Sequence, residues 1–165
     1  MKKITLILAL VMGIAISLEA QPRAIGARLG GNAEFSYQHQ LGSNMIDATV
    51  GVGYFGWMNV TATAVYDWVF PIKSWSHAGA WNWYAGPGIG VGYLFNTTGY
   101  GRNLYSGNSY IPVILNVGGQ IGVEYQFNFP LTLSVDYRPM FNVLGFGSGY
   151  WGDFYGAAIG VRYRF

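Results

Sequence analysis

The sequence predicts an all-β fold, specifically a transmembrane, antiparallel, eight-stranded up-and-down β-barrel. Three observations lead to this prediction. Only 10% of the residues are charged and 52% are hydrophobic, whereas a soluble domain carries about 25% charged residues. Outside the N-terminus no segment forms the unbroken apolar run of about 18 residues that a membrane helix needs. Short segments instead alternate apolar and polar residues, and a closed barrel is the strand structure that lipid tolerates.

The first twenty residues form a separate unit. Lys2 and Lys3 precede an almost wholly apolar stretch at 4–16, and Ser17, Leu18 and Glu19 lead up to Ala20. This order is typical of a secretory signal peptide. We therefore predict export through the inner membrane with cleavage of residues 1–20, which leaves residues 21–165 as a single outer-membrane barrel domain.

The last strand, residues 156–165, defines the two faces. Ala157, Ile159, Val161, Tyr163 and Phe165 share one parity, and small residues with Arg162 and Arg164 occupy the other. Side chains alternate between the two faces of a strand. One face therefore suits lipid and the other a polar interior.

Seven further strands follow the same rule, separated by glycine-, asparagine- or proline-containing turns. Pro71 begins a connection, and residues 96–110 and 143–153 form polar, glycine-rich loops. The expected strands are residues 24–30, 33–41, 45–55, 58–70, 81–95, 113–129 and 131–142.

Nine charged residues within these strands all fall on the glycine-rich parity. Charges enclosed in a narrow barrel must pair or form hydrogen bonds, so we predict a network that fills the lumen; a polar path or proton relay is the functional alternative. The predicted network consists of Arg28, Glu34, Asp47, Asp67, Glu124, Asp136, Arg138, Arg162 and Arg164.

The reverse arrangement, a soluble barrel of lipocalin type with the apolar face inside, conflicts with side-chain volume. An eight-stranded barrel has an interior just wide enough for side chains to fill. The apolar parity carries Trp68, Trp81, Trp83 and many other aromatic residues, which would overfill it. The aromatic residues near strand ends also suit membrane interfaces.

With these strands assigned, residues 24–165 resemble the small outer-membrane β-barrel proteins of Bacteroidota, which are similar in architecture to the OmpA and OmpX barrels. The resemblance rests on the segments AIGARLG (24–30), WYAGPG (83–88), GVEY (122–125), DYRP (136–139) and VRYRF (161–165). It implies that Val161, Tyr163 and Phe165 form a signal for the barrel assembly machinery. It implies no catalytic activity.

Other chemistry finds little support in the residues. The chain has no cysteine, which excludes disulfides and thiolate metal sites. Glycines 86–92 continue a strand instead of opening a helix, so they do not form a phosphate loop. The near-neutral mature chain suggests no nucleic-acid partner, and we expect no metal or cofactor.

An esterase would need a histidine base near a serine nucleophile. His39 and His77, the two histidines, fall at the periplasmic end of the predicted topology, whereas the serine-rich loops fall at the opposite end. Aromatic and polar loop residues suit recognition of an extracellular glycan or protein. The candidate recognition residues are Tyr100, Arg102, Tyr105, Tyr150 and Trp151.

The sequence thus predicts an outer-membrane protein, surrounded by outer-membrane lipids, with a filled polar lumen and a structural or surface-interaction role. A small porin-like channel is the main alternative. A lipid A-modifying acyl hydrolase or transferase is the third.

Overall fold

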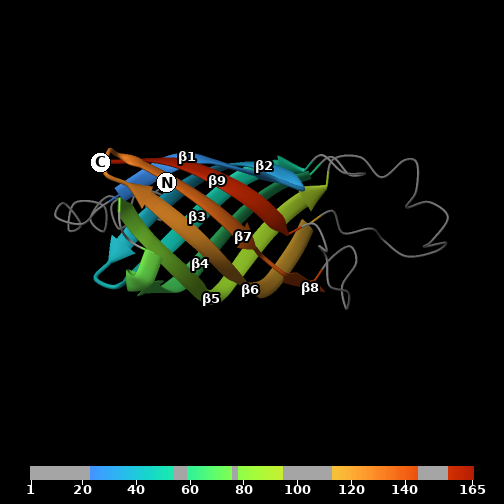
Figure 1. The fold of residues 1–165 in the computed structure, drawn as a ribbon. Helices are drawn as coiled ribbons and strands as arrows, with labels where there is room; N and C mark the ends of the chain where they lie inside the picture. The colour runs from blue at the N-terminus through green and yellow to red at the C-terminus, as the bar shows by residue number, and fades with distance from the viewer. Residues whose placement is uncertain (1–22, 54–58, 76–77, 95–112, 145–155) are drawn as a thin grey trace, which may run out of the picture.

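The protein forms a closed antiparallel β-barrel (Figure 1). The structure, a computed structural model, describes residues 23–53, 59–75, 78–94, 113–144 and 156–165. The predicted signal peptide, His77 and all five candidate recognition residues lie outside these ranges. No helix among the described residues is long and apolar enough to cross a membrane.

Nine labelled strands and one short 3-10 helix make up the described chain. They are β1 (Arg23–Gly30), β2 (Asn32–Leu41), β3 (Asn44–Gly53), β4 (Asn59–Pro71), η1 (Lys73–Trp75), β5 (Gly79–Leu94), β6 (Val113–Phe127), β7 (Leu131–Tyr137), β8 (Met140–Leu144) and β9 (Ala157–Arg164).

Each strand from β1 to β6 pairs with the next, and β9 pairs with both β7 and β1. The closing ladder runs from Ala24 opposite Arg164 to Gly30 opposite Ala158. Strand β8 continues along the same edge of β6 that β7 uses. The two therefore form one barrel strand, and the predicted eight-stranded barrel is confirmed.

The seventh strand was expected to run unbroken over residues 131–142, and that expectation is wrong at its middle. Pro139 has no backbone N–H to donate to a ladder, and the strand is interrupted between Tyr137 and Met140. The Arg138 N–H donates to the carbonyl of Gly156, and the Pro139 carbonyl accepts from Gly119. These two bonds fix the backbone at the interruption. Side chains on both sides of it therefore keep the same alternation between the inner and outer faces.

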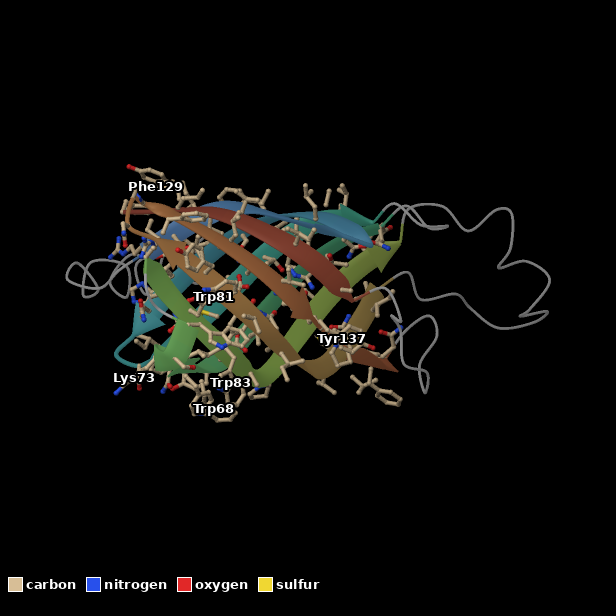
Figure 2. The ribbon with its side chains drawn as sticks, in the orientation of Figure 1. Trp68, Lys73, Trp81, Trp83, Phe129 and Tyr137 are labelled. Atoms are coloured by element: carbon tan, nitrogen blue, oxygen red, sulfur yellow. The ribbon has the colours of Figure 1, made fainter. Side chains whose placement is uncertain are left out.

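Apolar side chains of the alternating pattern cover the outside of the barrel. The exposed fraction is 57% for Leu29, 60% for Phe35, 63% for Ile89 and 62% for Val135. Trp83 is 40% exposed on this outer surface (Figure 2). The glycine-rich parity faces inward, as the volume argument required.

Arg23, the first described residue, and Phe165, the last residue, pair at one end of the barrel, which we call the terminal end (Figure 1). The turns at that end are short: residues 42–43 join β2 to β3, and residues 128–130 join β6 to β7. Gly42 adopts a φ of 62°, a conformation that favours glycine. Strands at the opposite end lead into residues 54–58, 95–112 and 145–155.

Candidate functional site: the interior charge network

Three arginines and three carboxylates meet inside the barrel and form a balanced cluster, which we call the central cluster. All six side chains are at least 93% buried. They come from β1, β2, β3, β7, the β7–β8 junction and β9, so the cluster links strands around the barrel wall. Its members are Arg28, Glu34, Asp47, Asp136, Arg138 and Arg162.

Arg28, on β1, links this strand to β2 and to β7. Its Nη1 lies 3.1 Å from Glu34 Oε2 on β2. Its Nε donates to Asp136 Oδ1 at 2.7 Å, and its Nη2 donates to the Gly156 carbonyl at 2.7 Å. Charge-assisted hydrogen bonds of this kind are stronger than neutral ones. Every nitrogen of the guanidinium group therefore has an acceptor.

Asp47 is the carboxylate that two arginines share. Its Oδ2 lies 3.2 Å from Arg162 Nη2 and 3.4 Å from Arg138 Nη2, and its Oδ1 accepts from Ser36 at 2.9 Å. Arg162 also donates to Ser36 Oγ and Ser134 Oγ, both at 2.7 Å. Arg162 is only 1% exposed. The low dielectric around such a pair strengthens the attraction but raises the cost of leaving either partner alone.

Arg138 connects the central cluster to a row of neutral side chains. Its Nη1 donates to Thr49 Oγ1 at 3.0 Å, and its Nε donates to Gln120 Oε1. The Gln120 amide in turn donates to Asp67 at 3.4 Å. The sequence pattern had placed Gln120 and Thr49 on the inner face, but nothing in it signalled that they bind the arginine.

Asp67 and Glu124 lie outside the balanced set. Both are buried, and within the described residues neither reaches an arginine at salt-bridge distance. Glu124 accepts from the amides of Asn82 and Gln126 at 2.9 Å and 2.7 Å. These two acids are therefore solvated by amide dipoles instead of by cations.

Arg164 differs most from its expected place. It is half-buried at the barrel end that holds the termini, and its hydrogen bonds go to the Gln126 amide oxygen and to the carbonyls of Phe127 and Phe129. Within the described residues it makes no ion pair with an acid. It secures the turn between β6 and β7, because its guanidinium group donates to a carbonyl at the end of β6 and to one within the turn.

Glycines on the inner face make room for the large side chains. A Cβ atom on Gly51 would meet the Glu34 side chain, one on Gly122 would meet the Tyr84 ring, and one on Gly160 would meet Ser134 and Arg162. Tyr84 is completely buried and donates to Asp136 at 3.4 Å. The narrow interior tolerates Tyr84 and the arginines because their neighbours lack side chains.

A small cavity opens at the terminal end of the interior, and no member of the central cluster lines it. Its volume is about 30 Å³, which corresponds to roughly two water molecules. Ten residues line it, among them Gln38, Met45, Glu124, Thr132 and Arg164. This volume is far below the roughly 300 Å³ at which small-molecule sites begin.

His39 lies on β2 with its side chain on the opposite parity from Ser36, and it stacks against Tyr37 with ring centroids 6.4 Å apart. The Ser36 and Ser134 hydroxyls are engaged by Arg162 inside the barrel. His39 is therefore not placed as a base for either serine. No group of three or more histidine, cysteine or acidic side chains among the described residues is arranged to hold a metal ion.

The residues of the predicted assembly signal lie on the outer face of β9 and just beyond it. Val161, Tyr163 and Phe165 are exposed, with Phe165 at 61%. The Phe165 N–H donates to the Arg23 carbonyl at 2.8 Å, which extends the closing ladder to the last residue. The terminal aromatic side chain is thus displayed outward at the seam where the barrel closes.

Comparison with known proteins supports the architecture. The N-terminal β-barrel domain of Pseudomonas aeruginosa OprF matches with 14% sequence identity and a TM-score of 0.57, over 88% of this chain and 96% of that one. The chain therefore has the fold of the OprF barrel domain. Neisserial surface protein A also matches, with 13% identity and a TM-score of 0.47, over 88% of this chain and 94% of that one. No protein-family model and no curated protein sequence matches the chain.

Proposed function

We propose that the protein is an integral outer-membrane barrel whose lumen is closed by the central cluster, and that its role is structural or one of surface interaction, without catalysis. This proposal rests on the difference in polarity between the outer and inner faces of the strands. Apolar side chains cover the outside, while all the strand charges of the described barrel, apart from those at the rim, are buried and held by polar partners.

The membrane position is supported by solvation. An outer surface formed by residues such as Leu29, Phe35, Ile89 and Val135 would be costly in water, since burial of apolar area stabilises by about 25 cal/mol per Å². Lipid removes that cost, and the closed ladder leaves no backbone edge in the hydrocarbon. The fold shared with the barrel domain of OprF agrees with this position. Export by a cleaved signal peptide at residues 1–20 would deliver the chain there.

The closed lumen is supported by the depth and pairing of the arginines. Arg28, Arg138 and Arg162 cross the interior from different strands and end on carboxylates of others. An ion passing through would have to displace pairs that lie in a low-dielectric environment. The small cavity at the terminal end adds little free volume. We infer that the barrel does not conduct as a static open pore.

Planar-bilayer recording with the purified, refolded mature chain tests this proposal. The closed lumen predicts no stable stepwise conductance for the wild type. Replacing both Arg138 and Arg162 with alanine removes two of the crossing side chains and should open a detectable conductance in chains that still fold. Stable unitary steps in the wild type would favour the porin-like alternative, and Arg162→Ala should then change the ion selectivity.

We propose that any surface interaction is made by the long loops. The two longest connections, which follow β5 and β8 in the chain, contain Tyr100, Arg102, Tyr105, Tyr150 and Trp151. Their composition suits contact with a glycan or protein. The barrel assembly machinery is the partner we propose for the outward-facing Val161, Tyr163 and Phe165.

A further inference from the structure

One charged side chain stands apart from all the others in the described barrel. Lys73 is exposed, whereas every other charged residue in the described ranges is buried or half-buried. Lys73 begins η1, in the connection between β4 and β5 at the barrel end that holds the termini. As the one exposed cation among the described residues, next to an apolar outer wall, Lys73 suits an anionic partner outside the barrel.

The backbone around Lys73 is anchored to the barrel wall. The Ile72 N–H donates to the Trp81 carbonyl at 2.7 Å, and the Trp75 N–H donates to the Ile72 carbonyl at 3.3 Å. The Trp75 ring meets the Trp81 ring edge to face, with centroids 5.7 Å apart. These contacts hold Lys73 at one position against β5, so its ammonium group is presented from a structured turn.

Aromatic side chains surround this position on the outer surface. Trp81 packs on Tyr125 at 4.8 Å between ring centroids, and Phe70 stacks on Trp83 at 4.3 Å. The four described tryptophans, Trp68, Trp75, Trp81 and Trp83, all belong to β4, β5 or the connection between them. Tryptophan concentrates at the headgroup level of a membrane. The β4–β5 side of the barrel therefore carries the strongest interfacial anchor among the described residues.

The level of Lys73 along the barrel fits the phosphate layer. Figure 2 shows Lys73 at the terminal end of the barrel, as far out as Phe129, with Trp68 and Trp83 nearer the middle. Indole rings and exposed aliphatic groups thus lie toward the hydrocarbon, and the ammonium group lies beyond them. A lipid beside this wall would place its acyl chains on Trp68 and the Phe70–Trp83 stack, and its phosphate near Lys73.

We propose that Lys73, together with Trp75 and Trp81, forms a binding site for the phosphate of an anionic glycerophospholipid in the leaflet at the terminal end of the barrel. This inference rests on the proposed membrane position of the protein. The lysine supplies the charge, and the indole rings supply the apolar wall. A lysine near an anionic membrane surface contributes enough to shift lipid selection about fivefold.

Lipid retention in nanodiscs tests the site. The mature chain is refolded into nanodiscs that contain equal amounts of dioleoyl phosphatidylglycerol and dioleoyl phosphatidylethanolamine, and the lipids that stay bound after mild detergent extraction are counted by native mass spectrometry. We expect the wild type to retain phosphatidylglycerol preferentially. Lys73→Gln should reduce the ratio of the two lipids about fivefold, whereas Lys73→Arg should preserve it.

The controls separate this site from the proposed function. Lys73 contacts no member of the central cluster, so all three proteins should show the same heat-dependent gel migration in nanodiscs. A wild type that fails to fold in lipid would overturn the outer-membrane proposal itself. Folded wild type and Lys73→Gln with equal lipid ratios would overturn the lipid site alone. Inorganic phosphate at about 10 mM would saturate a weak phosphate site. If it displaced the bound lipid, the site would be one for free phosphate, and the lipid proposal would be overturned.

Discussion

At the scale of single residues, the interior separates carboxylates that are held by arginines from carboxylates that are held by amides. Asp47 contacts Arg138 and Arg162, whereas Glu124 contacts Asn82 and Gln126. Both acids are buried to a similar degree. They therefore form a matched pair in which only the charge of the partners differs.

Asp47→Asn should destabilise the barrel much more than Glu124→Gln. The first change leaves two buried arginines without the carboxylate they share, and breaking a buried pair in this way costs about 3–5 kcal/mol. The second change leaves an amide oxygen that can still accept from the two neutral donors, strands no buried cation, and should cost about 1 kcal/mol. The measurement is the free energy of unfolding by urea in lipid vesicles. Equal losses for the two variants would show that the ion pairs do not stabilise the interior.

At the scale of elements, barrel closure depends on the close approach of β1 and β9. A Cβ atom on Gly26 would overlap the Val161 carbonyl oxygen in the closing ladder. The neighbouring residue Ala27 points outward and is exposed. The two positions lie on the same strand, but only the first has no room for a side chain.

Gly26→Ala should therefore reduce the yield of the closed barrel, while Ala27→Val should leave it unchanged. A backbone shift at the seam weakens the last ladder to form, and overpacking typically costs about 1–3 kcal/mol. The folded fraction after refolding is read from the band that changes mobility on heating. If Gly26→Ala folded as well as Ala27→Val, the seam would be looser than its geometry indicates.

The alternation of residues predicted the eight barrel strands and their faces, but the connection expected to begin at Pro71 is shorter, because Pro71 still belongs to β4 and pairs with Asn82. The alternation could not predict which inner residues meet. Arg28 and Asp136 share a hydrogen bond although 108 positions separate them, because the stagger of the closed barrel brings β1 and β7 to the same level. The level of a residue along the barrel depends on that stagger, which strand patterns do not encode. The stagger places Arg162 beside Asp47, whereas Arg164 lies beyond the reach of any described acid and binds the Gln126 amide oxygen.

The break at Pro139 escaped prediction for a related reason. A proline in a strand indicates an edge or an irregularity, and Pro139 was nevertheless included in an unbroken strand. The bonds that bridge the break come from Gly119 and Gly156, on two other strands. The closer resemblance to barrels of Bacteroidota stays a prediction, since no family model matches the chain.

At the scale of the whole molecule, the protein resembles a soluble domain turned inside out. Ion pairs and hydrogen bonds occupy its centre, and leucine, isoleucine, valine and aromatic residues cover its surface. Such a molecule is stable only in a solvent that accepts the apolar face. The inner face of each strand then stabilises the interior, and the outer face of the same strand contacts lipid.

The central claim, that the apolar parity faces lipid, can be tested with one spin label at a time. The chain has no cysteine, so Val135→Cys on β7 and Ile89→Cys on β5 each give a unique nitroxide site, with β6 between them. We measure collision rates of these labels with oxygen and with a water-soluble nickel chelate in vesicles. Our account predicts that oxygen collisions dominate at both sites. Dominance of the nickel chelate, or labels immobilised in a packed core, would contradict it.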